Sequence, residues 1–130
     1  MRSAAGGKGL AVPPAALITC IDACFDCARS CTACADASLA EDDRAMLTRC
    51  IALCLNCSDV CIATGRLLTR QTEFEPSVAR AQVEACRQAC GASREECERH
   101  AGHHEHCRVC AEACGRCEQA CEDVLSALPA

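Results

Sequence analysis

The sequence predicts an all-α protein, an antiparallel up-down four-helix bundle whose core is lined with cysteine. Cysteine occurs 17 times in 130 residues and recurs at steps of three and four. Leu, Ile, Val and Phe together make up under a fifth of the chain, and Trp and Tyr are absent. Such a composition offers too little apolar surface to offset the entropy of folding. The thiol, which packs as a small buried hydrophobe, is therefore expected to fill the interior.

The chain length suits one domain, expected at 13–130 after a flexible N-terminal tail at 1–12. The first helix is predicted at about 14–37, directly after Pro13. Its cysteines alternate in steps of three and four, which places them on one helical face, at the a and d positions that meet partner helices. They are Cys20, Cys24, Cys27, Cys31 and Cys34.

The second and third helices are expected at about 41–70 and 76–101. Ser38 with Glu41 suggests a capping box before the second helix. Either a second box, Thr72 with Glu75, or Pro76 as an early helical residue opens the third. The two helices carry the next cysteine stripes, which are Cys50, Cys54, Cys57 and Cys61, then Cys86, Cys90 and Cys97.

The fourth helix is expected at about 103–128. Only Gly102 separates it from the third, so one long bent helix over 76–128 is an alternative. We prefer a hairpin, because such a helix would be several times the average length of about 11–12 residues and would leave a poorly closed three-helix arrangement. The stripe of the fourth helix consists of Cys107, Cys110, Cys114, Cys117 and Cys121.

The up-down arrangement gives the bundle two different ends. One, which we call the histidine end, is expected to be polar and open, and it combines Cys34, Cys50, Cys97 and Cys107 with Met46, His100, His103, His104 and His106. At the opposite end, the apolar end, the same stripes continue as aliphatic residues. These are Leu17, Leu68, Val83, Val124 and Leu128.

Seventeen thiolates facing one core indicate a soft metal: Cu(I), Zn(II) or an iron–sulfur cluster. Neighbouring thiols on a helix can each hold a two-coordinate ion, and shared thiolates would form a continuous array. Replacing each thiol proton with Cu(I) leaves the core charge unchanged, whereas each four-thiolate Zn(II) site leaves two negative charges to be desolvated. The compact iron–sulfur loop signature is absent. The sequence therefore favours Cu(I), with many ions per chain.

The candidate metal ligands are all 17 cysteines together with His100 and His104, which share the phase of the cysteine stripe. His103 and His106 are candidates for a port where incoming Cu(I) meets imidazole, although a solvated turn is the alternative for all four histidines. Met46 lies four residues before Cys50 and is expected either to offer a thioether at the same end or to pack in the core.

Several classes of function are not expected. The net charge of −5 and the interspersed arginines argue against a nucleic-acid partner. No run of about 18 apolar residues is present, so no membrane partner is expected. The N-terminus resembles neither a secretory nor a twin-arginine signal, and an odd number of thiols argues against a disulfide framework, so a cytoplasmic location is predicted. No nucleophile–base pair is evident, and the protein is not expected to be an enzyme.

Over about residues 13–128 the chain resembles the cytosolic copper storage proteins. The matching features are the stacked CxxxCxxC stripes and the histidine-rich segment before the fourth helix. The resemblance implies high-capacity Cu(I) storage by core thiolates, uptake at the histidine end and a homotetramer. It identifies no copper donor or acceptor protein. Ser93 departs from the pattern, because it stands where another cysteine would sit, and so do His100 and His104. The alternative function is a zinc or general heavy-metal buffer.

Overall fold

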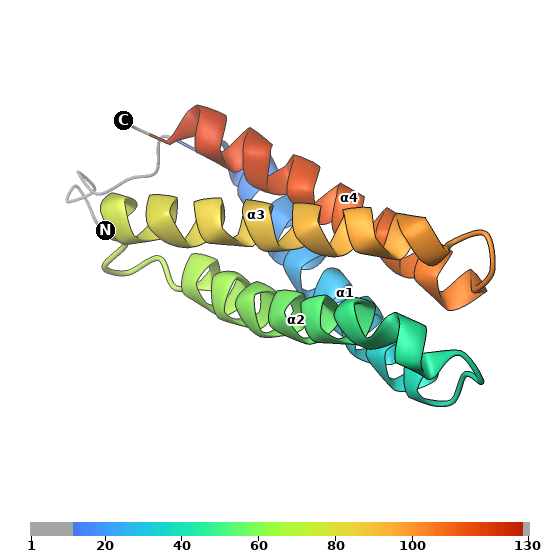
Figure 1. Ribbon diagram of the computed structural model, residues 1–130. Coiled ribbons are helices and arrows are strands. Elements are labelled where there is room, and N and C mark those ends of the chain that lie inside the picture. The colour runs from blue at the N-terminus through green and yellow to red at the C-terminus, as the bar shows by residue number, and fades with distance from the viewer. Residues whose placement is uncertain (1–11, 129–130) are drawn as a thin grey trace.

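The computed structural model describes residues 12–128 and contains four long helices joined by short connections (Figure 1). The elements in chain order are α1 (Pro14–Leu39), the short 3₁₀ helix η1 (Arg44–Leu47), α2 (Thr48–Thr69), α3 (Pro76–His100) and α4 (Glu105–Ala127). The predicted N-terminal tail lies outside the described residues except for Val12, which is buried. The all-α four-helix prediction is confirmed.

The helices form the predicted antiparallel square. Each packs against the next helix in the chain, and α1 also packs against α4. Among the described residues, the backbones of the diagonal pairs α1–α3 and α2–α4 are not in contact. Figure 1 shows the α1–α2 and α3–α4 connections together at one end, while the α2–α3 connection and both termini lie at the other. The interior is therefore a long channel-shaped core bordered by four helix faces.

The connections differ in detail from the sequence predictions. Ser38 is not a helix N-cap, because α1 continues through it to Leu39, and Glu41 belongs to the connection. The second helix accordingly begins at Thr48 after η1, later than the predicted position 41. Pro76 is at the start of α3 as expected, but Glu75 makes no capping hydrogen bond through its side chain, so the second box does not form. The α3–α4 break is present, between His100 and Glu105.

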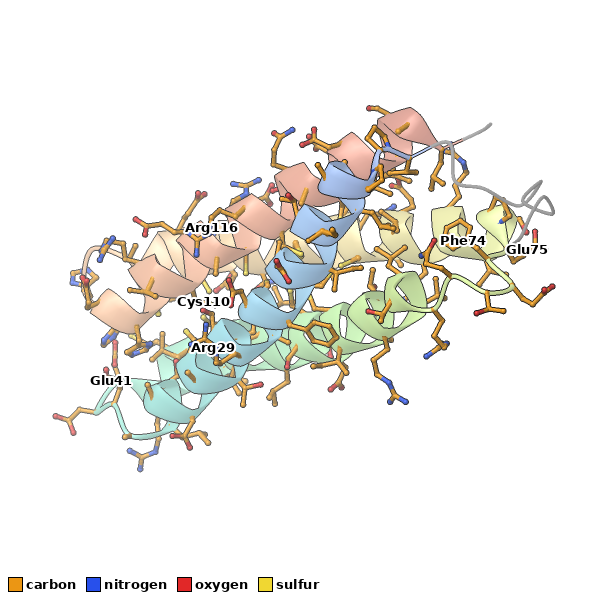
Figure 2. All side chains as sticks on the ribbon, turned by 180° about the vertical axis from the view of Figure 1, so that it is seen from behind. Arg29, Glu41, Phe74, Glu75, Cys110 and Arg116 are labelled. Atoms are coloured by element: carbon orange, nitrogen blue, oxygen red, sulfur yellow. The ribbon has the colours of Figure 1, made fainter. Side chains whose placement is uncertain are left out.

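Aliphatic side chains close the core at the apolar end, as predicted. Leu68, Val83 and Val124 are fully buried there, and Leu17 and Leu128 are nearly so. Phe74, from the α2–α3 connection, covers the same end (Figure 2). Burying a large aliphatic side chain contributes about 1.5–3 kcal/mol, more than a small thiol can. At this end, large aliphatic side chains rather than thiols therefore stabilise the metal-free fold.

The stretch Arg44–Thr69, which covers η1 and α2, is long and apolar enough to cross a membrane by length and composition alone, with a mean hydropathy of 1.5 over its best window. Cysteine raises this value, and the four cysteines of α2 are fully buried against the other helices. The core helix of a bundle has the same properties, so this single helix is weak support for a membrane span.

Candidate metal centre

All 17 cysteines point into the bundle and form one continuous sulfur-lined core. Each is at most 1% exposed, and none is in a disulfide. The spacing of three and four residues produces this result, because it keeps every stripe on the face that meets the other helices. Figure 2 shows labelled Cys110 inside the bundle, whereas Arg29 and Arg116 project outward. The cysteines extend from near the apolar end to the histidine end.

Sulfur atoms from different helices lie within bridging distance. The Cys31 and Cys114 Sγ atoms are 3.6 Å apart between α1 and α4. The Sγ atoms of Cys61 and Cys90 are 3.6 Å apart between α2 and α3. Thiols also meet across the diagonal, where Cys54 Sγ is 3.8 Å from Cys110 Sγ. These separations extend along the whole core, so ions bridging the thiols would cross-link all four helices.

The distances fit both three- and four-coordinate metal sites. With metal–sulfur bonds of about 2.3 Å, sulfurs are about 4.0 Å apart in a trigonal site, about 3.8 Å in a tetrahedral site and about 4.6 Å across a linear one. Several sets of four Sγ atoms lie within 4.8 Å of one another. Examples are Cys24, Cys86, Cys117 and Cys121, then Cys27, Cys57, Cys61 and Cys90, then Cys34, Cys54, Cys97 and Cys110. Geometry alone therefore admits both Cu(I) and Zn(II).

Charge distinguishes the two metals. The buried polar residues among those described are Ser38, Ser58, Thr64, Ser93 and Glu96, so no Lys or Arg faces the sulfurs. Tetrahedral Zn(II) on four thiolates would leave two uncompensated negative charges per site, which is costly in a low-dielectric core. Cu(I) in equal number to thiolates leaves the core neutral. The core composition favours a monovalent soft ion.

Ser93 occupies a ligand position without a thiol. It lies on the cysteine stripe of α3 and is fully buried. Its Oγ is 3.4 Å from Cys114 Sγ, 3.7 Å from Cys54 Sγ and 3.8 Å from Cys31 Sγ. The serine thus interrupts the sulfur lining on the α3 wall, while Cys31 and Cys114 continue it past this point.

His106 is the imidazole that reaches the thiols. Its Nδ1 lies 3.4 Å from Cys34 Sγ and 3.6 Å from Cys107 Sγ. Burial opposes protonation of His106, but hydrogen bonds with Cys34 and Glu41 outweigh it and raise its pKa. Burial raises the pKa of Cys107 to about 12. His106 Nδ1 is therefore in hydrogen-bonding contact with Cys34 at the outer limit of the sulfur core.

A surface hollow leads to this pair. A cavity of about 400 Å³ between α1 and α4 is lined by Cys34 and His106 together with Ala33, Glu105 and Val109. The sulfur of Cys34 is almost fully buried, yet the hollow reaches its side chain from outside. Cys34 and His106 are thus reached from the side of the bundle, between α1 and α4.

The other histidines are bound to carboxylates. His104 Nδ1 is 3.1 Å from Glu41 Oε2, and its Nε2 is 3.0 Å from Asp43 Oδ2. The hydrogen bond with Asp43 raises the pKa of His104. Both ring nitrogens of His104 consequently contact carboxylates, and neither faces a thiol.

His100 Nε2 is 3.1 Å from Glu96 Oε2, and the nearly buried Glu96 carboxylate is also 3.5 Å from Arg49. His103 is exposed and makes no side-chain hydrogen bond or ion pair within the described part of the chain. The structure thus brings His106 to the sulfurs and places His100 and His104, the two predicted ligands, in an outer ring with acidic partners.

Met46 does not face the core. Its side chain is 74% exposed, whereas Leu47 is fully buried beneath the same end. The prediction assumed continuous α-helical phase backward from Cys50. Residues 44–47 instead form a 3₁₀ helix with three residues per turn, and the inward position falls three residues before Cys50, at Leu47.

The carboxylates that hold the histidines were not predicted as part of the site. Glu96 precedes His100 by four residues on the same helix, a spacing that signals a contact. Glu41 and Asp43 had no such signal, because their histidine partners are more than 60 residues away in sequence. Only the packing of the α1–α2 connection against the start of α4 brings them together.

These features define a class of protein: a four-helix bundle whose thiol-lined core binds soft metal ions, with histidine at one end. The sequence profile of the copper storage protein family matches residues 14–126, and the chain belongs to that family.

Solved structures of Ccsp from Streptomyces lividans are similar to this chain. The form described as a copper storage protein loaded with 10 copper equivalents is 52% identical, with a TM-score of 0.89 over 90% of this chain and 89% of that chain. The form described as a cytosolic copper storage protein with five coppers is 53% identical, with a TM-score of 0.87 over 88% of this chain and 95% of that chain.

A cysteine-rich protein of Bacillus subtilis strain 168, YhjQ, is 32% identical over 92 residues, which is 71% of this chain and 80% of YhjQ. The similarity to these relatives therefore spans most of the bundle.

Proposed function

We propose that this protein stores Cu(I) in the cytosol as a bridged array on its 17 core thiolates. The observation that carries the proposal is the continuous sulfur network in a core where no Lys or Arg among residues 12–128 is buried. Such a core stays neutral when each thiol proton is replaced by Cu(I). The copper-loaded, cytosolic relative from Streptomyces supports the metal and the location.

Uptake is proposed at the histidine end. His106 is the nitrogen donor nearest the sulfurs, and the hollow beside Cys34 gives it access to solvent. His100 and His104, with His103 outside them, form an outer ring where Cu(I) would first meet imidazole. Carboxylates around this ring add a favourable field for a cation.

The role proposed is stoichiometric rather than catalytic. Storage needs many equivalent sites and no turnover. The thiol that contacts the His106–Glu41 pair, Cys34, is 1% exposed and belongs to the sulfur array. A homotetramer is proposed from the family resemblance. Ile18, Phe25 and Leu55 on the outer faces of α1 and α2 are large exposed hydrophobic residues that an interface between chains would cover.

The second candidate is a zinc or heavy-metal buffer, favoured by the four-sulfur groups that suit tetrahedral coordination. An anaerobic titration distinguishes the two. Reduced, metal-free protein is titrated with Cu(I) and separately with Zn(II), and bound metal is measured after gel filtration against a chromogenic chelator. Saturation near one Cu(I) per thiol supports storage. A few Cu(I) ions together with about four tightly bound Zn(II) ions would support the buffer instead.

A further inference from the structure

Glu41 links the two connections that close the histidine end. It lies between α1 and η1, and its carboxylate reaches the first turn of α4, where Oε2 is 2.9 Å from His106 Nε2 and 3.1 Å from His104 Nδ1. Figure 2 shows labelled Glu41 at this end, beside the turn between α3 and α4. The side chain is one-third exposed, so it is a surface group with two imidazole partners.

The contact with Glu41 decides which nitrogen of His106 keeps its proton. A neutral imidazole has one N–H and one lone pair, and an ionised carboxylate can only accept a hydrogen bond. Nε2, which faces Glu41, must therefore be the N–H donor. The lone pair is left on Nδ1, the nitrogen 3.4 Å from Cys34 Sγ and 3.6 Å from Cys107 Sγ.

Stacking on His104 fixes the same orientation. The two rings are 5.3 Å apart between centroids, with 26° between their planes. Because Glu41 Oε2 also lies 3.1 Å from His104 Nδ1, one carboxylate contacts both rings. If the His106 ring turned over about its Cβ–Cγ bond, Cε1 would replace Nε2 beside Glu41 and the Cδ2–H group would replace Nδ1 beside the sulfurs, so both contacts would be lost.

We propose that Glu41 is a positioning residue for copper uptake: it holds the Nε2 proton of His106 so that the Nδ1 lone pair faces the thiols of Cys34 and Cys107. The inference rests on the proposed Cu(I) function, but its geometric part concerns the metal-free protein. Carboxylate partners of metal-binding histidines commonly act this way, and losing one typically costs 10–100-fold in affinity or activity. Glu41 itself touches no metal.

The first experiment measures the tautomer without copper. Nitrogen-15 NMR of reduced, metal-free protein, above the pH where His106 titrates, should show a protonated Nε2 and an unprotonated Nδ1 on His106. Glu41→Gln should keep this pattern, because the amide oxygen still accepts the hydrogen bond. Glu41→Ala should mix the two tautomers. Asp42→Ala, which removes the same charge from an exposed neighbour, should leave the wild-type pattern. An unchanged tautomer in Glu41→Ala would overturn the inference.

The second experiment follows Cu(I) transfer from its bathocuproine disulfonate complex by stopped-flow absorbance. The first phase of uptake should slow by about 10-fold in Glu41→Ala, with Glu41→Gln and Asp42→Ala near wild type. In a His106→Ala background, Glu41→Ala should cause no further slowing. An additive effect there would show that Glu41 acts through charge alone and would refute the positioning role.

The two proposals fail separately. If the wild type takes up no Cu(I) array, storage is wrong whatever the NMR shows. If every variant saturates at the same high Cu(I) content but tautomer and rate do not respond to Glu41, storage stands and the positioning role is wrong.

Discussion

Replacing Ser93 with cysteine tests whether the Cu(I) capacity of the core depends on its number of thiols. The hydroxyl lies among Cys31, Cys54 and Cys114, and a sulfur at this position would complete the lining of the α3 wall. If capacity follows the number of core thiolates, Ser93→Cys should bind about one more Cu(I) per chain. The gain is one part in 17, so the readout must resolve single ions.

The structure also sets the cost of the substitution. The Ser93 Oγ to Cys114 Sγ distance is 3.4 Å, while the Cys31 and Cys114 sulfurs are 3.6 Å apart. Because a Cβ–S bond is also longer than a Cβ–O bond, the new sulfur has to move back by a few tenths of an ångström. A shift of this size costs at most about 1 kcal/mol, the low end of overpacking effects. The variant should fold, and its copper content can be compared directly with the wild type.

Native mass spectrometry of Cu(I)-saturated protein gives the integer content. Ser58→Cys is the matched control, because Ser58 is buried but its Oγ bonds to the Ala28 carbonyl and to Thr32 outside the sulfur core. It should add a thiol without adding an ion, and Ser93→Ala should leave capacity unchanged. Equal saturation of Ser93→Cys and wild type would refute the idea that each core position contributes a site.

Three further predictions concern stability. Leu68→Ala at the apolar end should lower the free energy of unfolding by about 2–5 kcal/mol in urea without changing Cu(I) capacity, whereas exposed Leu39→Ala should have little effect. Saturating Cu(I) should raise the unfolding temperature, and a chelator should reverse the rise. The reason is that each site adds about 4 kcal/mol to the free energy of unfolding when free Cu(I) is 1,000-fold above Kd. His104 has a raised pKa and Asp43 a lowered one, so their ion pair stabilises the fold between the ordinary pKa of the Asp, 3.8, and the ordinary pKa of the His, 6.5. The contribution of His104 is lost as pH rises through its raised pKa. The contribution of Asp43 is lost as pH falls through its lowered pKa. The urea midpoint should therefore fall less steeply above about pH 6.5 in Asp43→Asn than in Asp42→Asn.

The cysteine core was predictable because one physical signal determined both fold and chemistry. Steps of three and four place the thiols on helix faces, and so many soft ligands in one core imply a soft metal. The apolar end followed from the same stripes, since Leu68, Val83 and Val124 continue their phase. No knowledge of long-range contacts was needed for these predictions.

The histidine end was less predictable because it is built from connections. Because residues 44–47 form a 3₁₀ helix instead of an α-helix, Leu47 faces the core in place of Met46. The spacing of side chains in the sequence cannot reveal this change. Glu41 was assigned to a cap because it follows Ser38 by three residues, yet its hydrogen bond goes to His106, 65 residues away. The ligand prediction favoured His100 and His104 by phase, while the nitrogen nearest sulfur belongs to His106, in the first turn of α4.

The division between the two ends explains how a core of thiols can remain ready for metal. A core of aliphatic side chains would offer no metal ligands, and a core of small thiols alone would lack the larger burial free energy of those side chains. Here Leu68, Val83, Val124 and their neighbours hold the helices at one end, so the sulfurs at the other are already 3.6–4.0 Å apart before any ion arrives. Cu(I) then needs to displace protons rather than fold the chain. Zinc fingers, in contrast, fold only with their metal, so removing the metal unfolds them. A preformed array can fill and empty over many ions while the fold is retained, which is the behaviour that storage requires.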